Sequence, residues 1–175
     1  VGIGHYRNLI KAMGLVKAAA AKANGVAGVI SQEKADLIYR ASMDVAHGLL
    51  DNQFVVDAIQ GGAGTSTNMN ANEVIANRAL QIIGKNFGDY ETIHPINDVN
   101  ASQSTNDVYP TALKIALIFE MQELIRSLTT LENAYRTKAR EFSDVIKMGR
   151  TQLQDAVPMT LGQTFEAYAI TTGDD

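Results

Sequence analysis

The segment GRTQLQDAVPMTLGQ, residues 149–163, carries Arg, Thr, Gln and Asp side chains where a packing segment would have apolar residues. Two further stretches have the same character: GGAGTSTNMNANE at residues 61–73 and VNASQSTND at residues 99–107. Thr and Ser hydroxyls, Asn amides and the free N–H groups at helix starts all donate hydrogen bonds to carboxylate oxygens. Together the three stretches predict a binding site for a small anionic substrate.

Composition limits the kinds of partner. The chain has 175 residues, is 46% hydrophobic and carries a formal net charge of −4. It has no basic run, which argues against nucleic acid, because phosphate neutralisation needs clustered Lys and Arg. The lack of cysteine excludes disulfides and cysteine-ligated metals. No apolar run approaches the roughly 20 residues of a membrane span, and the start lacks a signal peptide's apolar core, so a cytoplasmic protein is expected.

Two helices are predicted before the first polar stretch. Residues 8–24 are rich in Ala, Leu and Lys, and Gly25 is expected to end this helix as its C-cap. Ser31 is expected to cap the N-terminus of the second helix, which covers residues 31–50. Apolar residues at three- and four-residue steps predict the inward face of this second helix: Ala35, Ile38, Ala41, Val45 and Leu49.

A third helix is expected to begin near Asn68 or Asn70 and to end at Gly84, which places the glycine-rich turn at a helix start. Taken alone, residues 61–73 are also typical of a plain Gly turn with an Asn helix cap. No strand precedes the turn and its spacing is not GxGxxG, so dinucleotide binding is not favoured. The predicted inward face of this helix consists of Val74, Ile75, Ala79, Leu80 and Ile83.

The longest predicted helix begins around Pro110, a residue suited to a helix's first turn, and ends at about Phe142. Its apolar seam has a period of about 3.5 residues, as in helix bundles. Additional apolar residues lie outside the seam and predict contacts with other helices or subunits. The seam consists of Leu117, Met121, Leu124, Leu128, Leu131, Tyr135 and Phe142, and the additional residues are Ile115, Ile118 and Ile125.

The sequence predicts no substantial sheet, apart from one extended piece at residues 144–148. The expected fold class is all-α, with a small helical N-terminal domain followed by the start of an elongated helical bundle. The first domain covers residues 1–103 and the truncated central bundle domain covers residues 104–175. The boundary falls there because His94-Pro95 and several Asn and Asp residues mark a loop before the long helix.

The second polar stretch allows two interpretations of one geometry. Asp107 suits the positive N-terminus of the long helix, so the stretch could be only a helix cap. Alternatively, Ser104, Thr105 and Asn106 present two hydroxyls, an amide and free N–H groups toward one point, which suits a carboxylate.

The third polar stretch also has a structural interpretation. Arg150 and Asp155 could simply pair with each other, and Pro158 could open the next helix. The remaining polar residues of residues 149–163 are not explained by this interpretation, since packing or assembly alone does not require them.

The three stretches together resemble the aspartase/fumarase superfamily, whose signature regions converge on one shared active site. The resemblance covers nearly the whole chain, and GGAGTS, SQSTND and GRTQLQDAVPMTLGQ lean toward its aspartate ammonia-lyases. Fumarases more often have a GSGTQSN-like first stretch and SQSSND in the second. The family's flexible loop with a GSSxMPxKxNP motif has no counterpart here, so the chain is expected to be an amino-terminal fragment.

The resemblance implies a lyase that reversibly eliminates ammonia from L-aspartate to give fumarate. It implies a homotetramer with active sites shared between chains. The catalytic base, a Ser, and a substrate-binding Lys and Asn belong to the absent loop, so this chain alone is expected to be inactive. Asn70 is implied as a supporting residue. The substrate-binding residues that it implies are Thr65, Ser104, Thr105, Asn106, Thr151 and Gln152.

Gln152 departs from the His that many relatives have at this position. A neutral amide does not titrate near pH 7, so its expected role is orientation of the substrate. Two alternatives remain: a fumarate hydratase of the same superfamily, and a non-catalytic helical assembly module. No cofactor is expected, and no metal either, because His5, His47 and His94 lack metal-ligand spacing and are expected in surface or capping roles.

Overall fold

The structure is a computed structural model that describes residues 2–175. Most of these residues are helical, which confirms the predicted all-α class. The chain divides into two compact units, one up to Phe119 and the other from Glu120 to Asp175. The elements along the chain are η1 (Ile3–His5), α1 (Arg7–Val26), α2 (Gln32–Ala46), η2 (Asp51–Gln53), α3 (Thr65–Ile82), η3 (Pro95–Val99), α4 (Thr105–Glu141), β1 (Ile146–Thr151), β2 (Gln154–Thr160) and α5 (Leu161–Asp174).

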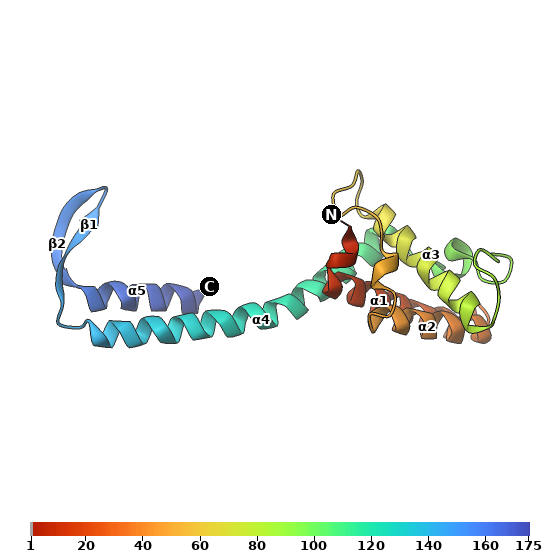
Figure 1. Cartoon of the computed structure of the whole chain (residues 1–175), viewed down its shortest axis with the longest axis horizontal. Coiled ribbons are helices and arrows are strands. Elements are labelled where there is room, and N and C mark those ends of the chain that lie inside the picture. Colours follow the sequence, from red (N-terminus) through yellow and green to blue (C-terminus); the bar gives the residue numbers. More distant parts are fainter. Residues whose placement is uncertain (1) are drawn as a thin grey trace. The chain divides into compact units, whose positions relative to one another are not determined.

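Helices α1 and α2 lie side by side in the first unit (Figure 1). The predicted cap at the start of α2 is confirmed, because the Ser31 hydroxyl oxygen accepts a hydrogen bond from the Lys34 N–H at 3.3 Å. The predicted C-cap at Gly25 is wrong, since α1 continues to Val26. A Cβ at Gly25 would lie 2.6 Å from the Ala35 Cβ, so this glycine instead permits close contact between the two helices.

Helix α3 begins at Thr65, earlier than the predicted start at Asn68 or Asn70. Its N-cap is Gly64, which has a φ of 88° in the left-handed region. Glycine adopts this conformation without strain, so the turn can lead directly into the helix. The glycine-rich turn therefore lies at a helix start, as predicted.

The predicted inward faces of α2 and α3 are correct except for one residue near the end of each helix and for Val74 in the middle of α3. Leu49 and Ile83 are exposed because α2 ends at Ala46 and α3 ends at Ile82, and Val74 is only half-buried. The other predicted inward residues are buried in one apolar core: Ala35, Ile38, Ala41, Val45, Ile75, Ala79 and Leu80.

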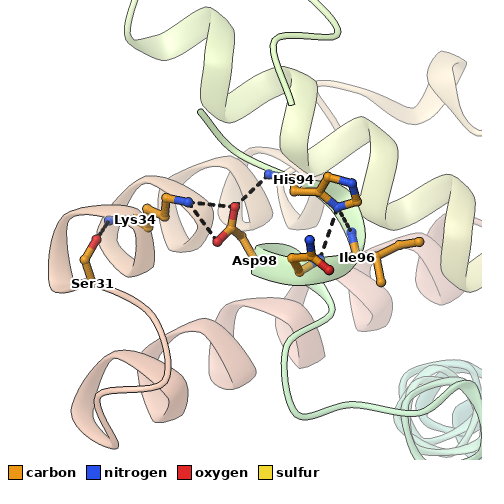
Figure 2. A network of polar contacts seen from close by, with 6 residues as sticks. Ser31, Lys34, His94, Ile96 and Asp98 are labelled. Atoms are coloured by element: carbon orange, nitrogen blue, oxygen red, sulfur yellow. Dashed lines mark hydrogen bonds and ion pairs between the residues drawn. The ribbon is translucent and has the colours of Figure 1, made fainter. Parts of the chain in front are cut away.

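A short π-helical turn, η3, precedes the polar segment that leads into α4. The capping role expected for His94 is confirmed: its Nδ1 accepts hydrogen bonds from the N–H groups of Ile96 and Asn97 at 3.0 and 3.2 Å. Asp98 accepts from the His94 N–H at 2.7 Å and from Lys34 Nζ at 2.9 Å (Figure 2). These bonds connect η3 to the start of α2.

Helix α4 begins at Thr105, so Pro110 lies inside the helix and not at its first turn. Its apolar seam is only partly covered. Leu124 and Leu131 are exposed and Leu128 is half-buried in the single chain. The predicted contacts of these residues with other helices or subunits stay a prediction.

The second unit contains the end of α4, a β-hairpin and α5. Helix α5 lies beside the end of α4 (Figure 1). Two seam residues, Tyr135 and Phe142, contact Phe165 of α5 with ring centroids 6.2 and 5.7 Å apart. Arg136 of α4 also forms a salt bridge with Glu166 at 2.8 Å. This end of the seam therefore packs against a helix within the chain.

The hairpin consists of the antiparallel strands β1 and β2, and β1 extends beyond the predicted piece at residues 144–148. Pro158 lies in β2 opposite Met148, so the prediction that it opens the next helix is wrong. Thr160 is the N-cap of α5 instead. It forms a capping box with Gln163, in which each side chain bonds the other's backbone N–H.

Helix α4 continues from the first unit into the second at Phe119 and Glu120. The domain boundary predicted between residues 103 and 104 concerns a longer helical bundle and stays a prediction. Within residues 2–175, no helix has the length and apolar character needed to cross a membrane.

Candidate functional site

Two hydrogen bonds between side chains and backbone N–H groups hold the start of α4. The Ser104 hydroxyl oxygen accepts from the Asn106 N–H at 3.1 Å, and the Asp107 carboxylate accepts from the Ser104 N–H at 3.1 Å. The capping role predicted for Asp107 is therefore confirmed. Ser104 and Asn106 are exposed, and they lie at the positive dipole end of the helix, which favours an anion.

Thr105 is half-buried, and a specific partner orients its hydroxyl. Its Oγ1 accepts a hydrogen bond from Nδ2 of Asn68, a buried residue of α3, at 3.2 Å. A threonine hydroxyl has one proton and two lone pairs. Because Asn68 occupies a lone pair, the Thr105 proton remains free to be donated in another direction.

A groove of about 390 Å³ lies between the glycine-rich turn and the first turns of α4, and we call it the α4 groove. The glycine-rich turn forms one side of the groove and the first turns of α4 form the other. Of the predicted site residues, Asn106 lines it directly. The groove is lined by Ala58, Gln60, Gly62, Ala63, Gly64, Asn106, Tyr109, Pro110 and Leu113.

Two features of the α4 groove depend on particular residues. A Cβ at Gly64 would lie 2.4 Å from Cγ of Tyr109, so only glycine permits this ring to cover the turn. Pro110 has no N–H for the carbonyl of Asn106, which would be its partner in a regular helix. The carbonyl of Asn106, a residue that lines the groove, thus lacks its usual helical donor.

Thr65 is exposed and is the first residue of α3, directly after Gly64. Residues three apart on a helix are neighbours on its surface, so Thr65 is a neighbour of Asn68. Asn68 in turn contacts Thr105. The first turns of α3 and α4 therefore meet, and four of the predicted substrate-binding residues lie on these two turns and the residue before α4.

Asn70 has a structural role. Its Oδ1 accepts from the Val55 N–H at 3.1 Å, and its Nδ2 donates to the Gln53 carbonyl at 3.0 Å. These bonds fix the segment before the glycine-rich turn. Asn70 also lines a larger groove of about 480 Å³, but none of the six predicted substrate-binding residues lines that groove.

Thr151 and Gln152 belong to the second unit, at the tip of the hairpin. Thr151 pairs with Gln154 at the end of the ladder. Gln152 and Leu153 form the turn with φ angles of 48° and 64°, and both are exposed. The pairing expected between Arg150 and Asp155 is confirmed by their salt bridge across the hairpin. The hairpin thus presents Thr151 and Gln152 on an exposed turn of the second unit.

A buried polar cluster that contacts Thr105 was not predicted from the sequence, and we call it the Asn100 cluster. Its signals were polar residues at helical spacing on apolar faces: Lys17 lies four residues after Met13 on α1, and Asn72 three before Ile75 on α3. Both spacings place a polar side chain among core residues. The Asn100 cluster consists of Lys17, Asn68, Asn72, Asn100 and Gln103.

Lys17 is the anchor of the Asn100 cluster. It has no exposed surface, and its Nζ donates to Asn100 Oδ1 and Gln103 Oε1, both at 3.0 Å. Burial disfavours the charged amine and lowers the pKa of Lys17 from 10.5 to about 7, against a smaller raising effect of the Asp107 charge. The amine is therefore held by side-chain oxygens in a largely apolar interior.

The histidines of residues 2–175 have surface or capping positions. His5 and His47 are exposed, and His94 caps η3 as described above. Within the described part of the chain, no group of three or more His, Cys, Asp or Glu side chains could hold a metal ion.

Comparisons with known proteins identify the family of the chain. A family described as Lyase matches residues 4–175. Aspartate ammonia-lyase from Pseudomonas fluorescens is 54% identical over 175 residues, which are 100% of this chain and 37% of that protein. The chain therefore spans little more than a third of the length of this relative.

Two solved structures are similar in fold and sequence. The fumarate lyase:delta crystallin from Brucella melitensis in native form has a TM-score of 0.89 and 55% identity, covering 99% of this chain and 40% of that one. A class II fumarase from Schistosoma mansoni has a TM-score of 0.84 and 38% identity, covering 96% of this chain and 35% of that one. The chain belongs to the lyase family, and the resemblance to the aspartase/fumarase superfamily is confirmed.

The buried Lys17 predicts how stability depends on pH. Between pH 7 and 10.5 the unfolded state binds more protons than the folded state, because the folded pKa is the lower one. The free energy of unfolding therefore rises with pH in this window. From pH 7 to 9 the complete protein should gain about 2 kcal/mol relative to its Lys17→Met variant. Denaturant unfolding of both proteins at the two pH values measures the gain. An equal change in the free energy of unfolding of the two proteins between pH 7 and 9 would contradict the prediction.

Proposed function

We propose that the complete protein that contains this chain catalyses the reversible elimination of ammonia from L-aspartate to give fumarate. The observation that carries the proposal is the Thr105 hydroxyl at the start of α4, which accepts a hydrogen bond from Asn68 and keeps its proton; the next residue, Asn106, lines the α4 groove. The proposal is supported by the three sequence stretches and by similarity to the P. fluorescens protein named aspartate ammonia-lyase.

The reaction needs stabilisation of charge on one carboxylate. A base removes a proton from the carbon next to that carboxylate, the electron pair forms the carbon–carbon double bond, and the carbon–nitrogen bond breaks to release ammonia. Negative charge builds on the carboxylate as an aci-carboxylate before ammonia leaves. Preorganised donors lower the barrier because they bind this state more strongly than the substrate.

The residues of this chain bind and orient the substrate in the proposal, and none of them is assigned as the base. Thr65, Ser104 and Thr105 donate to the carboxylate on which charge builds. Asn106 recognises the amino group with its side-chain amide. The backbone carbonyl of Asn106, which lacks a donor from Pro110, provides a second acceptor for an ammonium N–H.

Thr151 and Gln152 complete the proposed site by holding the other carboxylate. Their exposed position on a hairpin turn allows contact with substrate bound by another chain, which fits a site shared between subunits. The proposed assembly is a homotetramer. It is supported by large apolar side chains of α4 that this chain leaves exposed: Met121, Leu124, Ile125 and Leu131. The expected cytoplasmic location stays a prediction.

A fumarate hydratase of the same superfamily is the second candidate. It is favoured by the similarity to the S. mansoni class II fumarase, since the same donors can bind the carboxylate of malate. The neutral Gln152 argues against it, because many relatives have a titratable His there. A non-catalytic assembly module is the third candidate, but it leaves the donors around Thr105 without a role.

The choice between these candidates is tested by turnover. We expect the complete protein to release fumarate from aspartate and to process malate at least tenfold less efficiently, a difference of about 1.4 kcal/mol in transition-state binding. The change of ultraviolet absorbance of fumarate measures both reactions. The Gln152→His variant is the comparison, since it introduces the residue common among relatives. It should reduce the preference for aspartate over malate. Efficient turnover of malate without turnover of aspartate would support the hydratase, and turnover of neither would support the assembly module.

A further inference from the structure

Lys17 is a fully buried amine that the proposed chemistry does not use. Its two partners, Asn100 Oδ1 and Gln103 Oε1, are both 3.0 Å from Nζ. A charged amine has three N–H donors, and a neutral amine still has two, so both oxygens can be satisfied in either state. Lys17 therefore requires that Asn100 and Gln103 turn their oxygens toward it.

The Asn100 amide has only one orientation that fits these neighbours. With Oδ1 toward Lys17, its Nδ2 donates to the Gln103 carbonyl at 3.0 Å. A flipped amide would place an N–H₂ group against the Lys17 amine and an oxygen against that carbonyl. The orientation is thus set by the chemistry of the neighbours.

Asn100 in turn orients the two asparagines of α3. Its Oδ1 accepts from Asn68 Nδ2 at 3.1 Å and from Asn72 Nδ2 at 3.2 Å. The Oδ1 atoms of Asn68 and Asn72 are buried without a hydrogen-bond partner. An unpaired buried amide oxygen is unfavourable, yet turning either amide would bring two oxygens together. The cluster therefore keeps both N–H₂ groups toward Asn100.

The last hydrogen bond in this series joins Asn68 to Thr105. Asn68 Nδ2 has a second proton, which it donates to Thr105 Oγ1 at 3.2 Å. We propose that Asn68, oriented by Lys17 through Asn100, is a positioning residue that makes Thr105 a hydrogen-bond donor to the substrate carboxylate. This inference rests on the proposed function, because it assigns that carboxylate as the acceptor of the Thr105 proton.

Asn72 provides a matched control. It is buried on the same helix and donates to the same Asn100 oxygen, but its other contact is with Met69 Sδ at 3.5 Å and not with Thr105. In the complete protein, Asn68→Ala should lower kcat/KM for aspartate about tenfold, with most of the loss in kcat. Asn72→Ala should change kcat/KM less than about threefold. The thermal midpoints of the two variants should fall by similar amounts, since each loses one buried amide.

A double-mutant cycle separates positioning from general damage. In the Thr105→Val background, where the hydroxyl is absent, Asn68→Ala should change kcat/KM less than about twofold. Lys17→Met should show the same non-additivity with Thr105→Val, and if it does not fold, the Asn68 cycle decides alone. The inference would be overturned if the effects of Asn68→Ala and Thr105→Val on kcat/KM were fully additive, or if Asn68→Ala and Asn72→Ala lowered kcat/KM equally. In both cases, turnover of aspartate by the wild-type protein would still support the proposed function. A wild-type protein that releases no fumarate would overturn both.

Discussion

Replacement of Thr105 by valine in the complete protein is expected to lower kcat/KM for aspartate by about 10- to 150-fold. Valine has nearly the same shape as threonine but has no proton to donate. A hydrogen bond to a charged oxygen contributes roughly 1.5–3 kcal/mol, and its loss raises the transition-state barrier by that amount. Steady-state kinetics, followed by the ultraviolet absorbance of fumarate, measures the loss.

Two variants control for other effects of this substitution. Thr105→Ser keeps the hydroxyl and should retain kcat/KM within a few-fold of wild type. Thr111→Val alters an exposed threonine on the same helix, outside the residues that line the α4 groove, and should have no comparable effect. If Thr105→Val keeps wild-type kcat/KM, the hydroxyl does not bind the reacting carboxylate.

A substitution of Gly64 by alanine is expected to destabilise the complete protein by about 2–6 kcal/mol. Gly64 has a φ of 88°, and its added Cβ would lie 2.4 Å from Cγ of Tyr109. The left-handed backbone and the overlap with the ring each contribute roughly 1–3 kcal/mol. The ring can move away only if the Tyr109 side chain changes its χ1 angle or α4 shifts, and both are unfavourable. Denaturant or thermal unfolding measures the change.

Gly84 is the matched control for the backbone contribution. It also has a positive φ, 71°, but a Cβ there would meet no atom within 4 Å. Gly84→Ala should therefore cost about 1 kcal/mol, from backbone strain alone. Equal destabilisation by the two alanines would show that the Tyr109 ring does not confine Gly64.

Local sequence signals predicted the helices well where cause and effect are close in the chain. The Ser31 cap acts on a residue three positions away, and the apolar period of α3 identified Ile75, Ala79 and Leu80 as core. The failures at Gly25 and Pro158 have a different origin. Gly25 permits close contact with α2, which the local signal for a helix end does not include. Pro158 lies in β2, and its place there depends on pairing with Met148 of β1.

The candidate site was predicted only in part for the same reason. The donors at residues 104–106 were visible because their types and spacing are local. The orientation of the Thr105 hydroxyl depends on Asn68 and, further away, on Lys17, which is 83 residues from Asn100 in the chain. A lysine in an Ala-rich helix predicts a solvated surface, so only the packed structure identifies it as an anchor.

The most direct test of the account is a crystal structure of the complete protein with succinate, a saturated dicarboxylate that cannot undergo elimination. We predict that one carboxylate lies at the start of α4 with an oxygen about 2.6–3.0 Å from Thr105 Oγ1, while Asn68 Nδ2 remains bonded to the same hydroxyl. A carboxylate bound away from Thr105, with the Thr105 hydroxyl donating to a protein oxygen, would contradict the proposal that Thr105 binds the substrate carboxylate.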